Sequence, residues 1–386
     1  MIPLAELIAR FGPAYLARYG STALPSQRQA LAALGACRSR LASQMLAECS
    51  GCGEQRVVPH SCGHRACPHC QHFEGQRWIA RQSQALVAAP YFLITFTLPA
   101  ELRDLVWQHQ RELYAALMDE AWGTLQSFGS NHRQLQGQTG AVAVLHTHSR
   151  RLDFHPHVHL AMPAAALQEA GPEGGGALWR TLRGGARRRG YLFNHKALAQ
   201  VFRARCLAAL RALGLQPPPE APERWVVDCK SVGGARGGHK VMLYLGRYLY
   251  RGVIQERDIL RCEGEFVTYR WRDAKTRSWQ TRTVTGVEFL RLVLQHVLPK
   301  GFRRARNYGL LHPNCKRGVA LLRMLALRRR PEGVPDLARS ASTPTRPALL
   351  CRCCGGAMRI VRRRILPGSL ALAAPPPRKA EGEPTR

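Results

Sequence analysis

The spacing of apolar positions changes along the chain, and each change predicts a different element. Residues 1–48 carry apolar side chains at helical spacing, for example at Leu31 and Leu34, which predicts short helices. The run 91–98 is instead rich in β-branched and aromatic residues and is stopped by Pro99. Such a run is typical of a central strand.

Helical and strand patterns alternate through most of the remaining chain. Some strands lie close enough for hairpins, which favours an α+β domain around an antiparallel or mixed sheet flanked by helices. We expect a helical module at 1–75, a sheet domain at 88–310 and a basic, Pro-rich C-terminal region at 311–386. The expected helices are 73–90, 101–128, 192–213, 239–251 and 286–298, and the expected strands are 141–148, 157–162, 225–229, 266–271 and 278–284.

The charge balance predicts a polyanionic partner. The sequence has 57 Lys and Arg against 25 Asp and Glu, a net charge of +32, with arginine runs such as 187–189 and 362–364. Basic side chains that neutralise phosphates release condensed counterions, so we expect a nucleic acid as the partner. A ribosomal-type RNA binder is the alternative class that charge alone leaves open.

The sequence is typical of a reducing compartment. No apolar run approaches the roughly 20 residues that span a bilayer, and the charges and prolines between Met1 and Arg18 do not fit a secretory signal. We therefore expect a cytoplasmic protein whose 13 cysteines are reduced thiols rather than a disulfide framework.

Two CxxC pairs predict a zinc site in the 1–75 module. Cys49 and Cys52, with Cys67 and Cys70, offer four thiolates, a set that suits one tetrahedral zinc ion. Such a module either helps to grip DNA or is merely held folded by zinc. Its ligand set is not unique, because further donors lie in range: His60, Cys62, His64 and His69.

The other cysteines predict no second site. Cys351 and Cys354 lack an obvious partner pair, so we expect no independent tight site there. Four more are interpreted as isolated buried thiols: Cys37, Cys206, Cys229 and Cys262.

A His-x-His pair within the strand 157–162 predicts a second, different metal site. Residues two apart in a strand point to the same side, so His157 and His159 present two imidazoles to one ion while Val158 faces the core. A pair that leaves positions open suits a catalytic divalent metal. Ordinary surface histidines are the alternative, whereas metallo-β-lactamase-like enzymes need an Asp and a further His that do not follow here.

Two tyrosines share one face of the helix 239–251. Tyr244 and Tyr248 are four residues apart, so their phenols project side by side, while Tyr250 points elsewhere. Arg247 and Arg251 form a second such pair that could bind phosphates. Either the phenols are nucleophiles in a positive environment or they are two core aromatics. Three tryptophans are candidates for stacking on bases, although packing in the core is the favoured interpretation of each: Trp225, Trp271 and Trp279.

These motifs in this order resemble the HUH endonuclease superfamily. The segment 95–99 (Thr-Phe-Thr-Leu-Pro) is followed by the His157/His159 pair and then by the Tyr244/Tyr248 pair. Further motifs on both sides narrow the resemblance to one family. Upstream lie Ser61-Cys62 and Cys67-Pro68-His69-Cys70-Gln71. Downstream lie Leu298-Pro299-Lys300-Gly301-Phe302 and Arg306-Asn307-Tyr308-Gly309-Leu310. Together they look like the two-tyrosine rolling-circle insertion-sequence transposases of the IS91 family, over residues 15–325.

The resemblance implies a fold and a mechanism. The fold would be a five-stranded antiparallel sheet with helices, preceded by the small zinc-binding module. His157 and His159 would hold Mg²⁺ or Mn²⁺ on the scissile phosphate. Tyr244 and Tyr248 would attack in turn, each leaving a 5′-phosphotyrosine and a free 3′-hydroxyl. The partners would be single-stranded DNA and transposon-end hairpins, in the nucleoid of a prokaryote.

The sequence departs from the superfamily at the third metal ligand. Many relatives carry Gln seven residues before the first motif histidine, where this chain has Arg150, which cannot ligate. His148 and His155 are the nearest substitutes. Three alternatives stay open: a plasmid replication initiator or relaxase, although no helicase phosphate-binding motif occurs; an inactive zinc-dependent DNA binder; and an acidic-triad transposase, which the few carboxylates disfavour.

Overall fold

A five-stranded antiparallel sheet forms the centre of the molecule, which we describe from a computed structural model. Its strand order is β12-β4-β5-β3-β8, so β5 lies in the middle. The strands are β3 (Tyr91–Thr97), β4 (Gly140–His148), β5 (Phe154–Pro163), β8 (Val226–Ser231) and β12 (Ala305–Gly309). The structure describes residues 2–39, 41–87, 89–168, 178–181, 192–233, 237–250, 252–273, 275–315 and 348–366.

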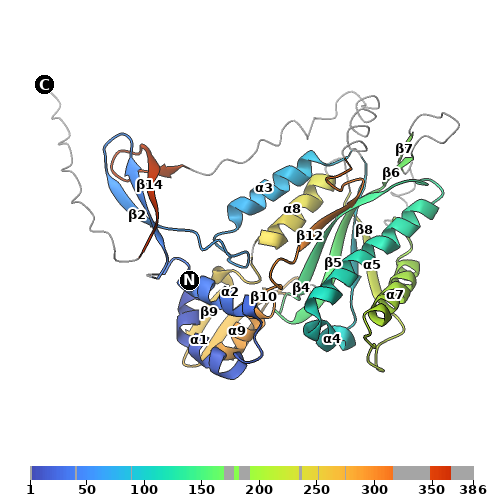
Figure 1. Cartoon of the computed structure of the whole chain (residues 1–386), viewed down its shortest axis with the longest axis horizontal. Coiled ribbons are helices and arrows are strands. Elements are labelled where there is room, and N and C mark those ends of the chain that lie inside the picture. The colour runs from blue at the N-terminus through green and yellow to red at the C-terminus, as the bar shows by residue number, and fades with distance from the viewer. Residues whose placement is uncertain are drawn as a thin grey trace.

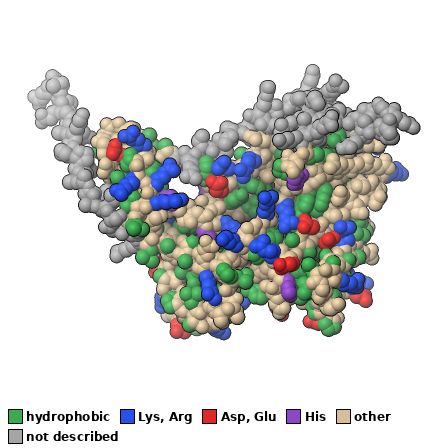
Figure 2. All heavy atoms as spheres, viewed as in Figure 1, with side chains coloured by type: hydrophobic (Ala, Val, Ile, Leu, Met, Phe, Trp, Pro, Cys, Tyr) green, Lys and Arg blue, Asp and Glu red, His purple; other side chains and the backbone are tan. Residues whose placement is uncertain are grey.

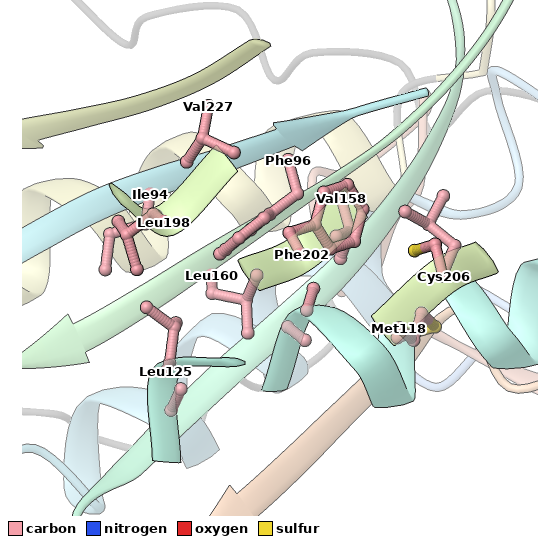
Figure 3. Close-up of a cluster of buried hydrophobic side chains, with 14 of the residues drawn as sticks. Ile94, Phe96, Met118, Leu125, Val158, Leu160, Leu198, Phe202, Cys206 and Val227 are labelled. Atoms are coloured by element: carbon pink, nitrogen blue, oxygen red, sulfur yellow. The ribbon is translucent and has the colours of Figure 1, made fainter. Parts of the chain in front are cut away.

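One face of this sheet packs on two helices, α5 (Gln110–Asn131) and α7 (His195–Ala212). Alternate residues of β5, including Val158 and Leu160, are fully buried in that core (Figure 3). Because side chains alternate along a strand, the histidines between them point to the opposite face. The prediction that Val158 faces the core is therefore confirmed.

The opposite face is covered by α3 (His72–Gln84) and α8 (Gly237–Tyr250), which lie side by side (Figure 1). The two helices approach closely because Gly246 of α8 has no side chain at the point where it meets Ile79 and Trp78 of α3. Leu245 and Met242 of α8 fill the space above the sheet. This packing fixes the helix on which the paired tyrosines lie.

A second core joins the N-terminus to a late segment of the chain. The helices α1 (Leu4–Tyr19) and α2 (Pro25–Ala36) pack with α9 (Gly286–Leu294). Phe11 of α1 lies directly over Gly286, where any Cβ would collide with its ring. The same core includes the sheet of β9 (Ile259–Glu263), β10 (Phe266–Arg272) and β11 (Trp279–Thr285).

A four-stranded sheet joins the two ends of the sequence. Its order is β13-β14-β1-β2, and in Figure 1 the blue N-terminal strands lie against the red β14. Residues from the expected 1–75 module and from the expected 311–386 region thus form one unit. The strands are β1 (Gln44–Cys49), β2 (Gln55–Pro59), β13 (Leu349–Leu350) and β14 (Ala357–Ile365).

The predicted elements match most of the observed ones within a few residues. The prediction that helices extend to residue 48 is wrong, because residues from Gln44 on belong to strand β1, which pairs with β2 and β14. The prediction of one helix over 101–128 is wrong, because η1 (Ala100–Leu102) and α4 (Arg103–Gln108) precede α5 and the backbone breaks at His109. No helix among the described residues has the length and apolarity that a bilayer crossing requires. The elements not yet named are β6 (Ala165–Gln168), β7 (Leu178–Thr181) and η2 (Glu256–Asp258).

Candidate active site

Three histidines converge on the α8 side of the sheet. His157 and His159 lie on the central strand β5, and His146 lies on β4, directly opposite His157 in the strand register. One ring nitrogen from each lies within 4.8 Å of the others. The sequence analysis missed His146, although the alternation of β4 places it on the same face as the motif pair.

The hydrogen bonds of these histidines leave nitrogens free to bind a metal ion. His157 donates from Nδ1 to the carbonyl oxygen of His155 at 2.7 Å, which leaves Nε2 as a free electron-pair donor. The Nδ1 atom of His159 is 2.8 Å from Thr95 Oγ1. The Nε2 atom of His146 is buried and has no hydrogen-bond partner among the described residues. Hydrogen-bond partners such as the His155 carbonyl and Thr95 orient metal-binding imidazoles. The three imidazoles therefore fit a divalent ion.

Burial keeps the three imidazoles neutral. Desolvation lowers the pKa of His157 to about 4 and that of His159 to about 3, and it lowers the pKa of His146 as well. A metal ligand must be deprotonated. At neutral pH all three side chains are therefore in the form that binds metal.

The suggested third ligands, His148 and His155, lie outside this group. His155 Nδ1 faces the guanidinium of Arg103 at 3.1 Å, and His148 Nδ1 donates to the carbonyl of Ser149 at 3.0 Å. Arg150 lies on the wall of the site and donates to the carbonyl of Arg272. The third imidazole beside His157 and His159 is instead that of His146, from the neighbouring strand.

Both predicted tyrosines face the histidines, but in different environments. Tyr244 is 46% exposed, and its ring lies 5.7 Å from that of His159, edge to face. Tyr248 lies deeper: its ring is parallel to that of His146, within 5°, and its hydroxyl is buried. Tyr250 instead packs against Trp78 of α3, as expected for a residue outside the pair.

A half-buried arginine that the sequence motifs do not mark lies over the inner tyrosine. The guanidinium carbon of Arg304 is 5.0 Å from the ring centre of Tyr248. Its position is fixed by donation to the carbonyls of Leu145 and Leu249. Burial raises the pKa of Tyr248, and the positive charge of Arg304 opposes that rise. No short motif marks Arg304, because it reaches the site from the loop before β12.

The histidines and tyrosines line one basic pocket of about 830 Å³. Its one lining carboxylate, Asp258, is paired with Arg270 at 3.0 Å. Figure 2 shows lysine and arginine side chains spread over the face in view, with acidic side chains among them. Arg251 lies outside the described residues. The basic residues that line the pocket are Arg150, Lys240, Arg247, Arg257, Arg270 and Arg272.

The three tryptophans differ in position. Trp271 and Trp279 line the pocket, and Trp279 is 57% exposed beneath the guanidinium of Arg270. Trp225 is buried in the main core against Phe202 and donates to a backbone carbonyl. Of the two interpretations, core packing is therefore the one that holds for Trp225, whose ring no base can reach.

The cysteines form two clusters rather than one. Cys67 and Cys70 lie with Cys37 and Cys62, whereas Cys49 and Cys52 lie with Cys351 and Cys354. The prediction of one site from the two CxxC pairs is therefore wrong in its grouping. The reason is that Cys49 and Cys52 lie at the β1–β2 turn of the four-stranded sheet β13-β14-β1-β2, the terminal sheet, whereas Cys67 and Cys70 lie outside that sheet. The predictions that Cys37 is an isolated thiol and that 351–354 lacks a partner pair are also wrong.

The first cluster has the dimensions of a zinc site. The Sγ atom of Cys37 lies 3.5 Å from that of Cys67 and 3.6 Å from that of Cys70, close to the edge of about 3.8 Å expected for zinc with four sulfurs. The histidines in range are not among these ligands, and His69 contacts Glu256 instead at 2.9 Å. Four thiolates with no open position suit a structural zinc ion.

Comparisons with known proteins cover both parts of this structure. A family model described as "Transposase zinc-binding domain" matches residues 7–98, which contain the whole first cysteine cluster. A second model, described as "Putative transposase", matches residues 140–318, which contain the three histidines and both tyrosines. No solved structure matches the chain significantly.

Two curated relatives are transposases. The chain is 30% identical over 330 residues to "Putative transposase y4qJ" of Sinorhizobium fredii, which covers 80% of each protein. It is 29% identical over 279 residues to "Transposase for insertion sequence element IS801" of Pseudomonas savastanoi pv. phaseolicola, covering 67% of this chain and 63% of that relative. With the two domain matches, these likenesses show that the chain belongs to the IS91 family of transposases and carries an N-terminal zinc-binding domain.

Proposed function

We propose that this transposase cuts and rejoins single-stranded DNA by tyrosine attack, in the manner of rolling-circle transposition. The observation that supports this most is the placement of two tyrosines of one helix beside three converging imidazoles in a basic pocket. Its substrate would be transposon-end DNA, hairpins included, in the prokaryotic cytoplasm. The coarser function, transposition of DNA, rests on the relatives alone.

The histidines His146, His157 and His159 would hold Mg²⁺ or Mn²⁺. When bound, such an ion polarises the scissile phosphate and offsets its developing charge. The neutral imidazoles leave the charge of the ion undiminished, in contrast to a carboxylate site. The surrounding arginines and Lys240 would orient the DNA backbone on either side of the cut.

The outer tyrosine, Tyr244, would make the first attack. In that step the oxygen of Tyr244 bonds to phosphorus, the bond from phosphorus to the 3′ oxygen breaks, and the phenolic proton ends on the released 3′-hydroxyl. Tyr244 is exposed to the pocket, whereas the hydroxyl of Tyr248 is enclosed. The products are a 5′-phosphotyrosine and a free 3′ end. Tyr248 would act on the second strand end once its ring leaves the face of His146.

Trapping of the covalent intermediate tests this proposal. The full chain is incubated with a labelled single-stranded transposon end and Mn²⁺, and adducts are mapped by mass spectrometry. We expect the adduct on Tyr244 in the first turnover, and none in the double variant Tyr244→Phe/Tyr248→Phe. Tyr250→Phe is the matched control, because it removes a hydroxyl from the same helix but outside the pocket. An adduct that persists in the double variant contradicts the mechanism.

A further inference from the structure

The second cysteine cluster connects two turns from opposite ends of the sequence. Cys49 and Cys52 belong to the turn between β1 and β2, and Cys351 and Cys354 to the turn between β13 and β14. The Sγ atoms of Cys49 and Cys354 are 3.5 Å apart, and those of Cys52 and Cys351 are 3.6 Å apart. These distances are too long for a disulfide of about 2.0 Å and close to the edge of about 3.8 Å in a zinc–sulfur tetrahedron.

The two turns repeat the same backbone geometry. The glycine after the second cysteine has a positive φ in both, 76° at Gly53 and 72° at Gly355. In both, the amide of this glycine donates to the carbonyl of the first cysteine at 3.1 Å. In the first turn the amide of Gly51 points at the sulfur of Cys49, at 3.4 Å. In the second turn the amide of Cys353 points at the sulfur of Cys351, at 3.3 Å. Two equivalent turns thus aim four thiols at one point.

The sheet that carries these turns has little else to hold it together. Its buried apolar cluster consists of Ala47, Cys49, Cys351 and Met358, so half of the buried side chains are cysteines of the cluster. A sheet with so small a core gains its folding free energy from a bound metal, since the site forms only in the folded state.

We propose that Cys49, Cys52, Cys351 and Cys354 bind a second structural zinc ion, which fastens the C-terminal strands to the N-terminal hairpin. Two of its ligands, Cys351 and Cys354, lie beyond the zinc-binding domain of the family model, which ends at residue 98 and already contains the complete first cysteine cluster. Zinc takes the place of the thiol protons, which are released to solvent; one of these is now donated by Cys351 to the carboxylate of Glu54, at 2.9 Å.

A neighbouring residue offers a matched control. Cys353 is exposed and lies between the two proposed ligands of its turn. It belongs to a rival group with Cys52 and Glu54, so it separates the two possible ligand sets. Substitution of Cys353 changes the thiol content of the turn without touching the proposed site.

Metal analysis of the full chain tests the site. Native mass spectrometry should find two zinc ions per chain, one in Cys351→Ser/Cys354→Ser, and two in Cys353→Ser. Because the serine variant loses a folding contribution, Cys354→His is made in parallel, and it should keep both ions because imidazole replaces a thiolate in tetrahedral sites. One zinc in the unsubstituted protein, or two in the double serine variant, overturns the proposal.

Alkylation of thiols gives a second readout that is independent of DNA cleavage. In the native protein Cys353 should react with iodoacetamide, while Cys351 and Cys354 stay protected. In Cys49→Ser/Cys52→Ser the protection of the C-terminal pair should be lost, although Cys67 and Cys70 remain protected by the first zinc. Equal reactivity of all three C-terminal thiols in the native protein contradicts the assignment.

Discussion

At the scale of single residues, His146 lies between the proposed metal site and the inner tyrosine, Tyr248. Its ring lies between the motif histidines and the ring of Tyr248, 4.2 Å from that of His159. It is 1% exposed, so its imidazole has no role at the surface. One side chain would thus serve both the proposed metal site and the position of a proposed nucleophile.

We expect His146→Ala to abolish cleavage while DNA binding stays nearly intact, because affinity comes from dispersed basic contacts. The loss of cleavage rate should exceed the loss of about 10–100-fold that follows removal of an outer hydrogen-bond partner of a metal ligand. His146→Gln should retain part of the activity, since an amide oxygen can still ligate. Cleavage rates and Mn²⁺ affinity are the measurements.

His155→Ala is the control for this prediction. His155 also lines the pocket but lies outside the ligand group, so its loss should leave Mn²⁺ affinity unchanged. Normal cleavage by His146→Ala would show that two imidazoles suffice and would remove His146 from the site.

Local spacing predicted some site residues and not others. His157 and His159, like Tyr244 and Tyr248, share a face because of the period of one strand or one helix, so the sequence alone indicates them. His146 enters through the register between two strands. Arg304 reaches the site from a loop that lies far beyond the tyrosines in the sequence, 55 residues after Leu249. No periodicity encodes such contacts.

At the scale of elements, the close contact of α8 with α3 makes a prediction about stability. Alanine normally stabilises a helix relative to glycine by about 1 kcal/mol. At Gly246 the added methyl group would collide with Ile79, and overpacking costs about 1–3 kcal/mol. We therefore expect Gly246→Ala to lower the free energy of unfolding, measured with urea.

Arg247→Ala provides the comparison on the same helix. Arg247 is exposed, so its substitution should change the free energy of unfolding by no more than about 0.5 kcal/mol. Equal stability of the Gly246→Ala and unsubstituted proteins would mean that α3 and α8 can separate without cost.

The β10–β11 hairpin makes a prediction about DNA affinity. Trp279 is exposed on the pocket wall, and a base stacked on an aromatic ring contributes about 1–3 kcal/mol. We expect Trp279→Ala to weaken single-stranded DNA binding by about 5–150-fold, measured by fluorescence anisotropy, with unchanged stability. Trp107→Ala is the control, since Trp107 is 37% exposed but lies away from the pocket. Equal affinity of both variants would exclude stacking at Trp279.

Elements with a clear period were predicted, and those held by distant partners were not. The β10–β11 hairpin and α8 follow from local patterns. Strand β12 is a short polar segment with every residue half-buried, and its pairing with β4 is what makes it a strand. The same holds for β14, whose arginine-rich sequence has no alternation of its own.

At the scale of the whole molecule, the charge of +32 predicts a steep salt dependence of DNA binding. When the logarithm of the affinity for single-stranded DNA is plotted against the logarithm of the salt concentration, the slope should be about −0.7 for each phosphate neutralised. Arg247→Ala should reduce the magnitude of this slope by about 0.7. Trp279→Ala should weaken binding but leave the slope unchanged. A slope near zero in titrations with NaCl would contradict the electrostatic contribution.

The division into segments was the least predictable feature of the molecule. The expected boundaries at 75 and 310 follow changes in composition, yet Phe11 packs on Gly286 and β1 pairs with β14. Both contacts bring together residues that are far apart in sequence. Apolar patterning shows that a face must be buried but not which distant face covers it.

The pairing of β1 with β14 has a consequence for biosynthesis. Cys52 and Cys351 are separated by 299 residues, and at about 5–20 residues per second a ribosome needs roughly 15–60 s to translate that stretch. Throughout this time the edge of β1 that later pairs with β14 remains unpaired. A nascent chain that terminates before β14 can never complete the sheet, so this sheet forms only in transposase molecules whose translation has passed Ile365.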